Sequence, residues 1–140
     1  METRGARGLG VEFAASLRCA RPDLSEAENR KLFGRRAEQH GHNYRLELTV
    51  RGEPDPVTGM VIDIKAIQGL LEREIMERFD HRDLNRDTPY FEKMPPTPEN
   101  LARVIREILV KAFPGGMLDR IRLQPDEDTW VEIAEPEAPA

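Results

Sequence analysis

The sequence predicts an α+β fold in which helices pack on one face of an antiparallel sheet. Residues 44–51 alternate strictly between apolar and polar side chains, as in a half-buried strand. Residues 64–79 and 97–112 instead place apolar side chains at helical spacing. The predicted order is strand, strand, strand, helix, helix, strand, strand, with a short helix inserted after the first strand.

The chain has 140 residues, which suits a single domain with one core. We expect this domain to cover residues 11–133, with residues 1–10 as a flexible N-terminal tail and residues 134–140 as a flexible C-terminal tail.

The first half of the domain contains three predicted strands and the inserted helix. The helix starts at Ser25, where Glu28 completes a capping box, and ends before Gly34. A turn rich in proline and acidic residues ends at Gly59, so the strand that follows it is expected to form a hairpin with the alternating strand. The three predicted strands cover residues 11–19, 44–51 and 60–64.

The second half begins with a helix whose apolar face includes Ile67, Leu71 and Ile75. Thr97 is a favourable N-cap for the next helix, because Pro98 suits the first helical position. Strands at 118–123 and 130–133 follow. The sheet would have open edges, which subunit association could cover.

Composition excludes several classes of function. The net charge is -5 and no Lys/Arg cluster is present, so nucleic-acid binding is not expected. No apolar run is long enough to cross a membrane, and the first ten residues lack the apolar core of a signal peptide. One cysteine cannot form an internal disulfide framework. These features predict a cytoplasmic protein.

Two groups of histidines are candidate functional residues. His40 and His42 would leave the same face of an extended segment and could share a zinc ion, although a third ligand is needed. His81 lies between Asp80 and Asp83, and an Asp–His pair can relay a proton. The alternative for each group is a solvated polar residue in a loop or at a strand end.

Several stretches, in the same order, resemble the 6-pyruvoyltetrahydropterin synthase family, which includes the bacterial 6-carboxytetrahydropterin synthases. The resemblance covers nearly all of residues 11–133, and its most specific stretches are 40–44 and 55–61. The other stretches that carry it are 13–16, 22–29, 32–34, 80–85, 89–91 and 97–100.

The resemblance implies a tunnelling fold, with two helices on one face of a four-stranded antiparallel sheet. Three sheets would close a barrel, and two trimers would stack into a homo-hexamer. It also implies active sites between subunits, pterin substrates and a catalytic zinc held by three histidines. The family activity is that of a carbon–oxygen lyase on dihydroneopterin triphosphate.

The sequence departs from the family at three functional positions. The first zinc histidine aligns with Leu17, which cannot bind a metal, and the catalytic cysteine aligns with Arg36. The glutamate that binds the pterin aligns with Pro125, although Asp126 or Glu127 could substitute if the turn were redrawn. We therefore expect the usual synthase reaction to be lost.

Cys19 could rescue the metal site, because it would share a strand face with Leu17 and a thiolate binds zinc. The alternative is a buried cysteine that behaves as a small apolar residue. We expect no cofactor, or zinc at low occupancy, or zinc held with the help of Cys19.

Three functions remain open. A binding protein would hold a pterin-like ligand through Thr97, Glu127, Arg36 and backbone donors, with Arg35 and Arg36 attracting a negative group. An enzyme with altered chemistry would use His81 as base, oriented by Asp80. An ordinary 6-carboxytetrahydropterin synthase would need three zinc histidines, and the chain has only three histidines in all, which leaves none for the relay.

Overall fold

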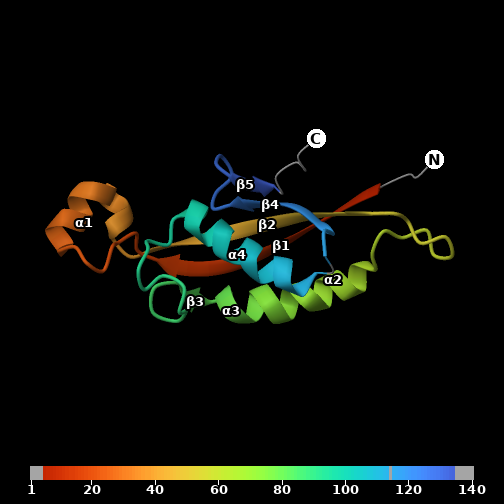
Figure 1. Cartoon of the computed structure of the whole chain (residues 1–140). Coiled ribbons are helices and arrows are strands. Elements are labelled where there is room, and N and C mark those ends of the chain that lie inside the picture. Colours follow the sequence, from red (N-terminus) through yellow and green to blue (C-terminus); the bar gives the residue numbers. More distant parts are fainter. Residues whose placement is uncertain (1–4, 114, 135–140) are drawn as a thin grey trace.

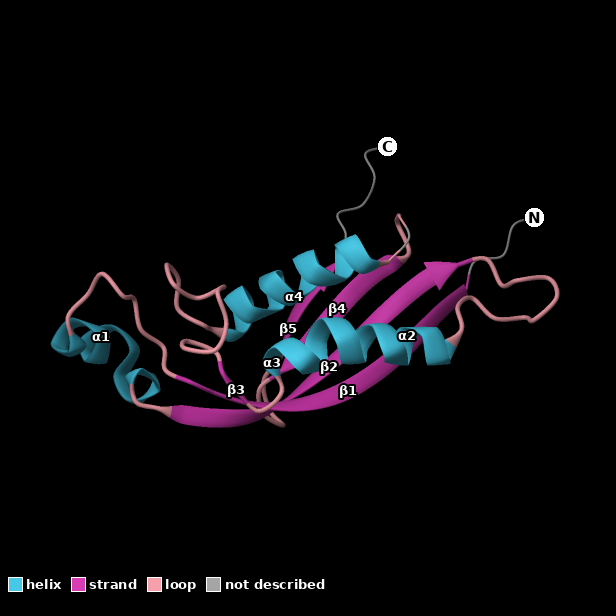
Figure 2. Cartoon of the chain, turned by 90° about the horizontal axis from the view of Figure 1, so that it is seen from below, coloured by secondary structure: helices cyan, strands magenta, loops and turns pink. Residues whose placement is uncertain are grey.

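The computed structural model describes residues 5–113 and 115–134. A twisted sheet in the order β3-β1-β2-β4-β5 carries all the long helices on one face (Figures 1 and 2). The α+β prediction is confirmed: four strands are antiparallel, and the very short β3 adds a fifth in parallel. The strands are β1 (Gly5–Leu17), β2 (His40–Gly52), β3 (Arg82–Asp83), β4 (Leu118–Gln124) and β5 (Val131–Ala134).

The first strand is longer at its start than the sequence predicts. β1 pairs with β2 without interruption from Gly5↔Gly52 to Leu17↔His40. The prediction of a flexible tail is therefore wrong for residues 5–10, whereas residues 1–4 and 135–140 lie outside the described part. The reason is that this glycine-rich segment is held by backbone hydrogen bonds to β2, which its side-chain pattern does not signal.

The predicted strand at residues 60–64 is wrong, and so is the hairpin it would form. Asp55 closes a turn by accepting hydrogen bonds from the amides of Val57 and Thr58 at 2.8 and 3.0 Å. Asp63 then caps a helix, because its side chain accepts a hydrogen bond from the amide of Lys65 at 2.9 Å. A short apolar run fits a strand and a helix start equally well, and here the cap decides.

The helices follow the predicted apolar faces. α2 (Ile64–Leu71), a π-helical turn η2 (Glu72–Met76) and α3 (Glu77–Phe79) form one continuous rod beside α4 (Pro98–Ala112) (Figure 2). Thr97 caps α4 as predicted, its hydroxyl accepting from the amide of Asn100 at 3.2 Å. Between sheet and helices lies the core, in which the rings of Phe13 and Tyr44 stack at 5.1 Å.

A helical arm projects from one end of the sheet. It consists of α1 (Glu26–Phe33) and the 3-10 turn η1 (Gly34–Ala37), at the orange end of Figure 1. The predicted capping box of Ser25 and Glu28 is present. Only Asn29 is buried within α1, and its side chain hydrogen-bonds the backbone of Arg21 in both directions. The arm returns the chain to the start of β2.

Both edges of the sheet are open over much of their length within the described residues. β3 pairs with Ala15 and Ser16, and Asp80 and His81 hydrogen-bond the backbone of Ala14, which leaves the outer edge of β1 unpaired from Gly5 to Phe13 among the described residues. β5 forms the opposite edge. None of the described helices has the length and apolar character needed to span a membrane.

Candidate functional site

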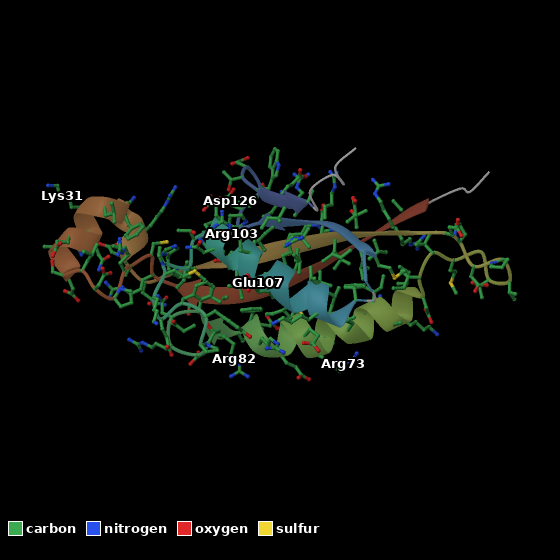
Figure 3. All side chains as sticks on the ribbon, viewed as in Figure 1. Lys31, Arg73, Arg82, Arg103, Glu107 and Asp126 are labelled. Carbon is green, nitrogen blue, oxygen red and sulfur yellow. The ribbon has the colours of Figure 1, made fainter. Side chains whose placement is uncertain are left out.

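A cavity of about 760 Å³ lies at the end of the sheet where β1 ends and β2 begins. The arm, the N-terminus of α4 and the turn between β4 and β5 form its other walls. Asp126, labelled in Figure 3, marks that turn. The lining includes Leu17, Cys19, Phe33, Arg35, Arg36, His40, His42, Tyr44, Thr97, Glu99, Pro125, Asp126 and Trp130.

His40 and His42 lie on the same face of β2, as the sequence predicts. Their rings are 5.1 Å apart between centroids and nearly perpendicular. Nδ1 of His40 lies 2.7 Å from the carbonyl oxygen of Glu38, which leaves Nε2 for another partner. The His42 ring in turn contacts Tyr44 at 5.4 Å. The two histidines thus form one wall of the cavity.

The third position of this wall is apolar. The β1–β2 register places Leu17 directly opposite His40, and Leu17 is 2% exposed. Among residues 5–113 and 115–134, no three His, Cys, Asp or Glu side chains form a group that could hold a metal ion. The residues present therefore do not fit a three-histidine zinc site.

Cys19 lines the same cavity but does not complete a metal site. It is buried, and its amide donates to the carbonyl of Arg36 at 2.7 Å. Burial raises the pKa of the Cys19 thiol, and the nearby charge of Arg36 opposes this only in part. β1 ends at Leu17, so Cys19 does not share a strand face with it, and no group of three metal-ligating side chains among the described residues includes Cys19.

The pKa of His42 is lowered, which favours the neutral imidazole. Burial lowers its pKa from the ordinary 6.5, and the charges of His40 and Arg36 lower it further, against the opposing effects of Asp126 and the Pro125 backbone. A neutral imidazole can accept or donate one hydrogen bond. His42 can therefore recognise a polar ligand atom.

Arg36 brings a permanent positive charge to this cavity. Its guanidinium is close enough to act on both Cys19 and His42. Neither Arg36 nor its neighbour Arg35 forms an ion pair within the described residues. Both guanidiniums are therefore available to a negative or carbonyl group of a ligand.

The other predicted ligand-binding residues differ in position. Thr97 lines the cavity, and its hydroxyl can still donate a hydrogen bond while it caps α4. Glu127 is exposed and does not line the cavity. Asp126 does line it, but its Oδ1 already accepts three hydrogen bonds from Asp128 and Thr129. Pro125 offers no acid.

Asp80 and His81 form a pair elsewhere. Oδ2 of Asp80 lies 3.0 Å from Nδ1 of His81, while Oδ1 accepts from the amide of Ala14 at 2.9 Å. That amide is the main reason why the pKa of Asp80 lies below its ordinary value. His81 is 84% exposed and lines a different hollow, beside Gly41. Within one chain His81 does not line the cavity that contains His40 and Arg36, but its hollow shares His42 with that cavity.

Asp83 does not orient His81, although the sequence suggested that it could. Its carboxylate instead accepts hydrogen bonds from Gln39 and from the amides of Asn85 and Arg86. The sequence also gave no role to Trp130 or Glu99, which both line the cavity. Trp130 is 52% exposed, and its ring centroid lies 4.3 Å from the guanidinium carbon of Arg122. The sequence signal that could have pointed to it is that Trp130 is the single tryptophan of the chain.

Comparison with known proteins identifies the family to which this chain belongs. The family model for 6-pyruvoyl tetrahydropterin synthase matches residues 11–136. The chain belongs to the 6-pyruvoyl tetrahydropterin synthase family. Proteins named 6-pyruvoyl tetrahydrobiopterin synthase from Pongo abelii and Homo sapiens are 40% and 39% identical over 123 residues, which cover 86% of this chain and 85% of each relative.

The fold of the family is also that of this chain. The structure of Caenorhabditis elegans 6-pyruvoyl tetrahydropterin synthase superposes with a TM-score of 0.88 and 27% sequence identity, covering 96% of this chain and 98% of the other. The tunnelling fold expected from the resemblance is therefore confirmed.

Proposed function

We propose that this member of the 6-pyruvoyl tetrahydropterin synthase family binds a pterin-like small molecule between subunits, without zinc and without the usual synthase reaction. The observation that carries the proposal is the pairing of Leu17 with His40. A buried leucine closes the third position of the histidine wall, so a metal would have two protein ligands where a catalytic zinc needs three.

Arg36 supports the proposal independently. A guanidinium cannot replace a thiolate as base or nucleophile, because it stays protonated. Its fixed charge also opposes a metal cation in the same cavity. It can instead hold a carbonyl or anionic group of the ligand.

The remaining lining suits a flat heterocycle. The cavity volume of about 760 Å³ falls within the range of small-molecule sites. Tyr44, Phe33 and Trp130 supply aromatic surface, while Thr97 and His42 supply polar groups. A family-type anchor for the pterin amino group is missing at Pro125, so the acids that line the cavity, Glu38, Glu99 and Asp126, are the candidates for this role.

Assembly would complete the site. The open edges of β1 and β5 can pair with other copies, and we propose a homo-hexamer built as a dimer of trimers. In such an assembly the exposed His81 of one copy can face the cavity of another. Within one chain, His81 lines a separate hollow that shares only His42 with the cavity.

The test combines metal analysis, turnover and ligand binding on the purified protein. We expect well under one zinc per chain, no turnover of dihydroneopterin triphosphate, and a melting temperature that rises saturably with a pterin from a panel. Trp130→Ala should weaken the shift, whereas Val110→Ala, an exposed apolar control outside the cavity, should not. Stoichiometric zinc or synthase turnover would contradict the proposal, and so would a flat response to every pterin.

A second candidate function is a lyase with altered chemistry. The Asp80–His81 pair favours it, because a 3.0 Å contact to a carboxylate orients the imidazole for proton transfer. This function predicts turnover of a substrate related to dihydroneopterin triphosphate that is lost in His81→Ala. Equal turnover by His81→Ala would remove the pair from the mechanism.

A further inference from the structure

A second hollow lies on the other side of η1. Its volume is about 890 Å³, and it is bounded by the arm and by the loop that follows β3. It shares Glu38 and Gln39 with the histidine-lined cavity but contains none of the histidines. Its lining residues are Arg18, Glu26, Ala27, Arg30, Ala37, Glu38, Gln39, Asp83 and Arg86.

Arg18 is fixed in place at this hollow. Its amide donates to Oδ1 of Asn85 at 2.9 Å, and Nδ2 of Asn85 donates back to its carbonyl at 3.0 Å. The side chain, in contrast, contains an unsatisfied donor: Nε is buried and has no hydrogen-bond partner within the described residues. A buried unpaired donor on a charged group is costly, so such a group calls for a partner.

Arg86 supplies a second guanidinium to the same hollow. Its amide donates to Oδ1 of Asp83 at 3.1 Å, which holds the backbone of the loop. No ion pair engages the side chain of Arg86, or that of Arg18, within the part of the chain that the structure describes.

The acids of the hollow are mostly occupied. Asp83 accepts from the amides of Asn85 and Arg86 through Oδ1, and from the side chains of Ser16 and Gln39 through Oδ2. Glu38 pairs with Arg30 at 3.6 Å. Glu26, exposed in the first turn of α1, has no ion pair among the described residues, and the donors to Asp83 are uncharged, so two unpaired guanidiniums share the hollow with the carboxylates of Glu26 and Asp83.

We propose that this hollow binds a polyanionic small molecule of the phosphate class, held between the guanidiniums of Arg18 and Arg86. Guanidinium groups match phosphate oxygens in pairs of parallel hydrogen bonds. The hollow has room for more than one phosphate, which favours a diphosphate or a phosphorylated metabolite over a single ion.

The inference does not depend on the pterin-like ligand. The two hollows have separate lining arginines, Arg18 and Arg86 in one, Arg35 and Arg36 in the other. Trp130→Ala, which tests the pterin cavity, should leave anion binding unchanged.

The experiment is calorimetric titration of the full chain with inorganic pyrophosphate at constant ionic strength. Saturable binding is expected for the wild type, with affinity reduced by about tenfold or more in Arg86→Gln and in Arg18→Gln. Arg73→Gln is the matched control, because Arg73 is exposed on the helical rod and lines neither hollow (Figure 3). Arg86 is exposed, so Arg86→Gln should fold even if Arg18→Gln does not.

Three results would overturn the proposal. The first is absence of pyrophosphate binding by the wild type up to about 10 mM, the weak limit of a specific site. The second is equal affinity of Arg86→Gln and wild type. The third is a change of oligomer mass in Arg86→Gln without any pyrophosphate binding, which would assign the two arginines to an acidic side chain of a second copy.

Discussion

The two histidine groups of this chain contrast in how their partners are supplied. His40 and His42 lie within paired strands, where the residue opposite each one is set by the β1–β2 register. His81 lies in a turn, where its partner Asp80 is the preceding residue. The strand pair places two histidines opposite Leu17 and Ala15, whereas the turn holds a contacting carboxylate and imidazole.

This difference shows where a lost side chain can be replaced. In a sheet, the register continues through twelve further pairs, so a neighbouring residue such as Cys19 cannot shift into the place of Leu17. In a turn, the neighbours in sequence are also neighbours in space. A function that depends on cross-strand geometry is therefore lost with one substitution, while a local pair survives.

The largest predicted effect is restoration of the metal site by Leu17→His. The new imidazole would lie opposite His40 and complete a three-histidine set, so zinc affinity should rise on the order of a thousandfold, ~4 kcal/mol. Titration with zinc under a competing chelator measures this. Leu17→Asn, which is polar but a poor zinc ligand, is the control. If Leu17→His binds zinc no better than Leu17→Asn, the histidine wall is not the remainder of a metal site.

The next largest effect concerns the turn. Asp80→Ala removes the acceptor for the Ala14 amide and should lower the free energy of unfolding by about 1–2 kcal/mol. Because the folded-state pKa of Asp80 is lowered, this stabilisation is present above its ordinary value of 3.8 and is lost as the pH falls through the lowered value. Chemical denaturation of both proteins at several pH values checks this. A deficit that persists at the lowest pH would mean that the carboxylate charge is not its source.

A smaller effect should distinguish the backbone strain at His81 from the contribution of its imidazole to stability. His81 has φ 60°, which L side chains tolerate poorly. His81→Gly should therefore be more stable than His81→Ala by about 1 kcal/mol, although both lack the imidazole. Thermal melts of the two variants decide this. Equal stability would show that the turn relaxes when the Asp80 contact is removed.

The smallest effect is a change in pH dependence at His42. Its folded-state pKa lies below the ordinary 6.5, so the unfolded chain binds more protons between these two pH values and stability falls as the pH drops below 6.5. His42→Gln should flatten this part of the stability profile, whereas Asn43→Gln, its neighbour, should not. An unchanged slope in His42→Gln would contradict the burial of the imidazole.

Many elements of the fold could be predicted from local patterns. The alternation of Tyr44, Leu46 and Leu48 fixed one buried strand face, and the caps at Ser25 and Thr97 marked two helix starts that the structure confirms. The prediction failed for residues 5–10 and 60–64. In the first case pairing depends on a distant strand, and in the second a short apolar run carries no period of its own.

The candidate site divides in the same way. The sequence by itself determined the family and the shared face of His40 and His42, and it predicted that Leu17 and Arg36 stand where the family has a histidine and a cysteine. Only the tertiary structure decided that Leu17 faces His40, that Oδ1 of Asp126 is occupied by its own turn, and that His81 lines a separate hollow that shares only His42 with the cavity. The physical reason is that a sequence motif specifies only which side chains are present. Strand register, burial and hydrogen bonds between distant segments determine which of these side chains come into contact.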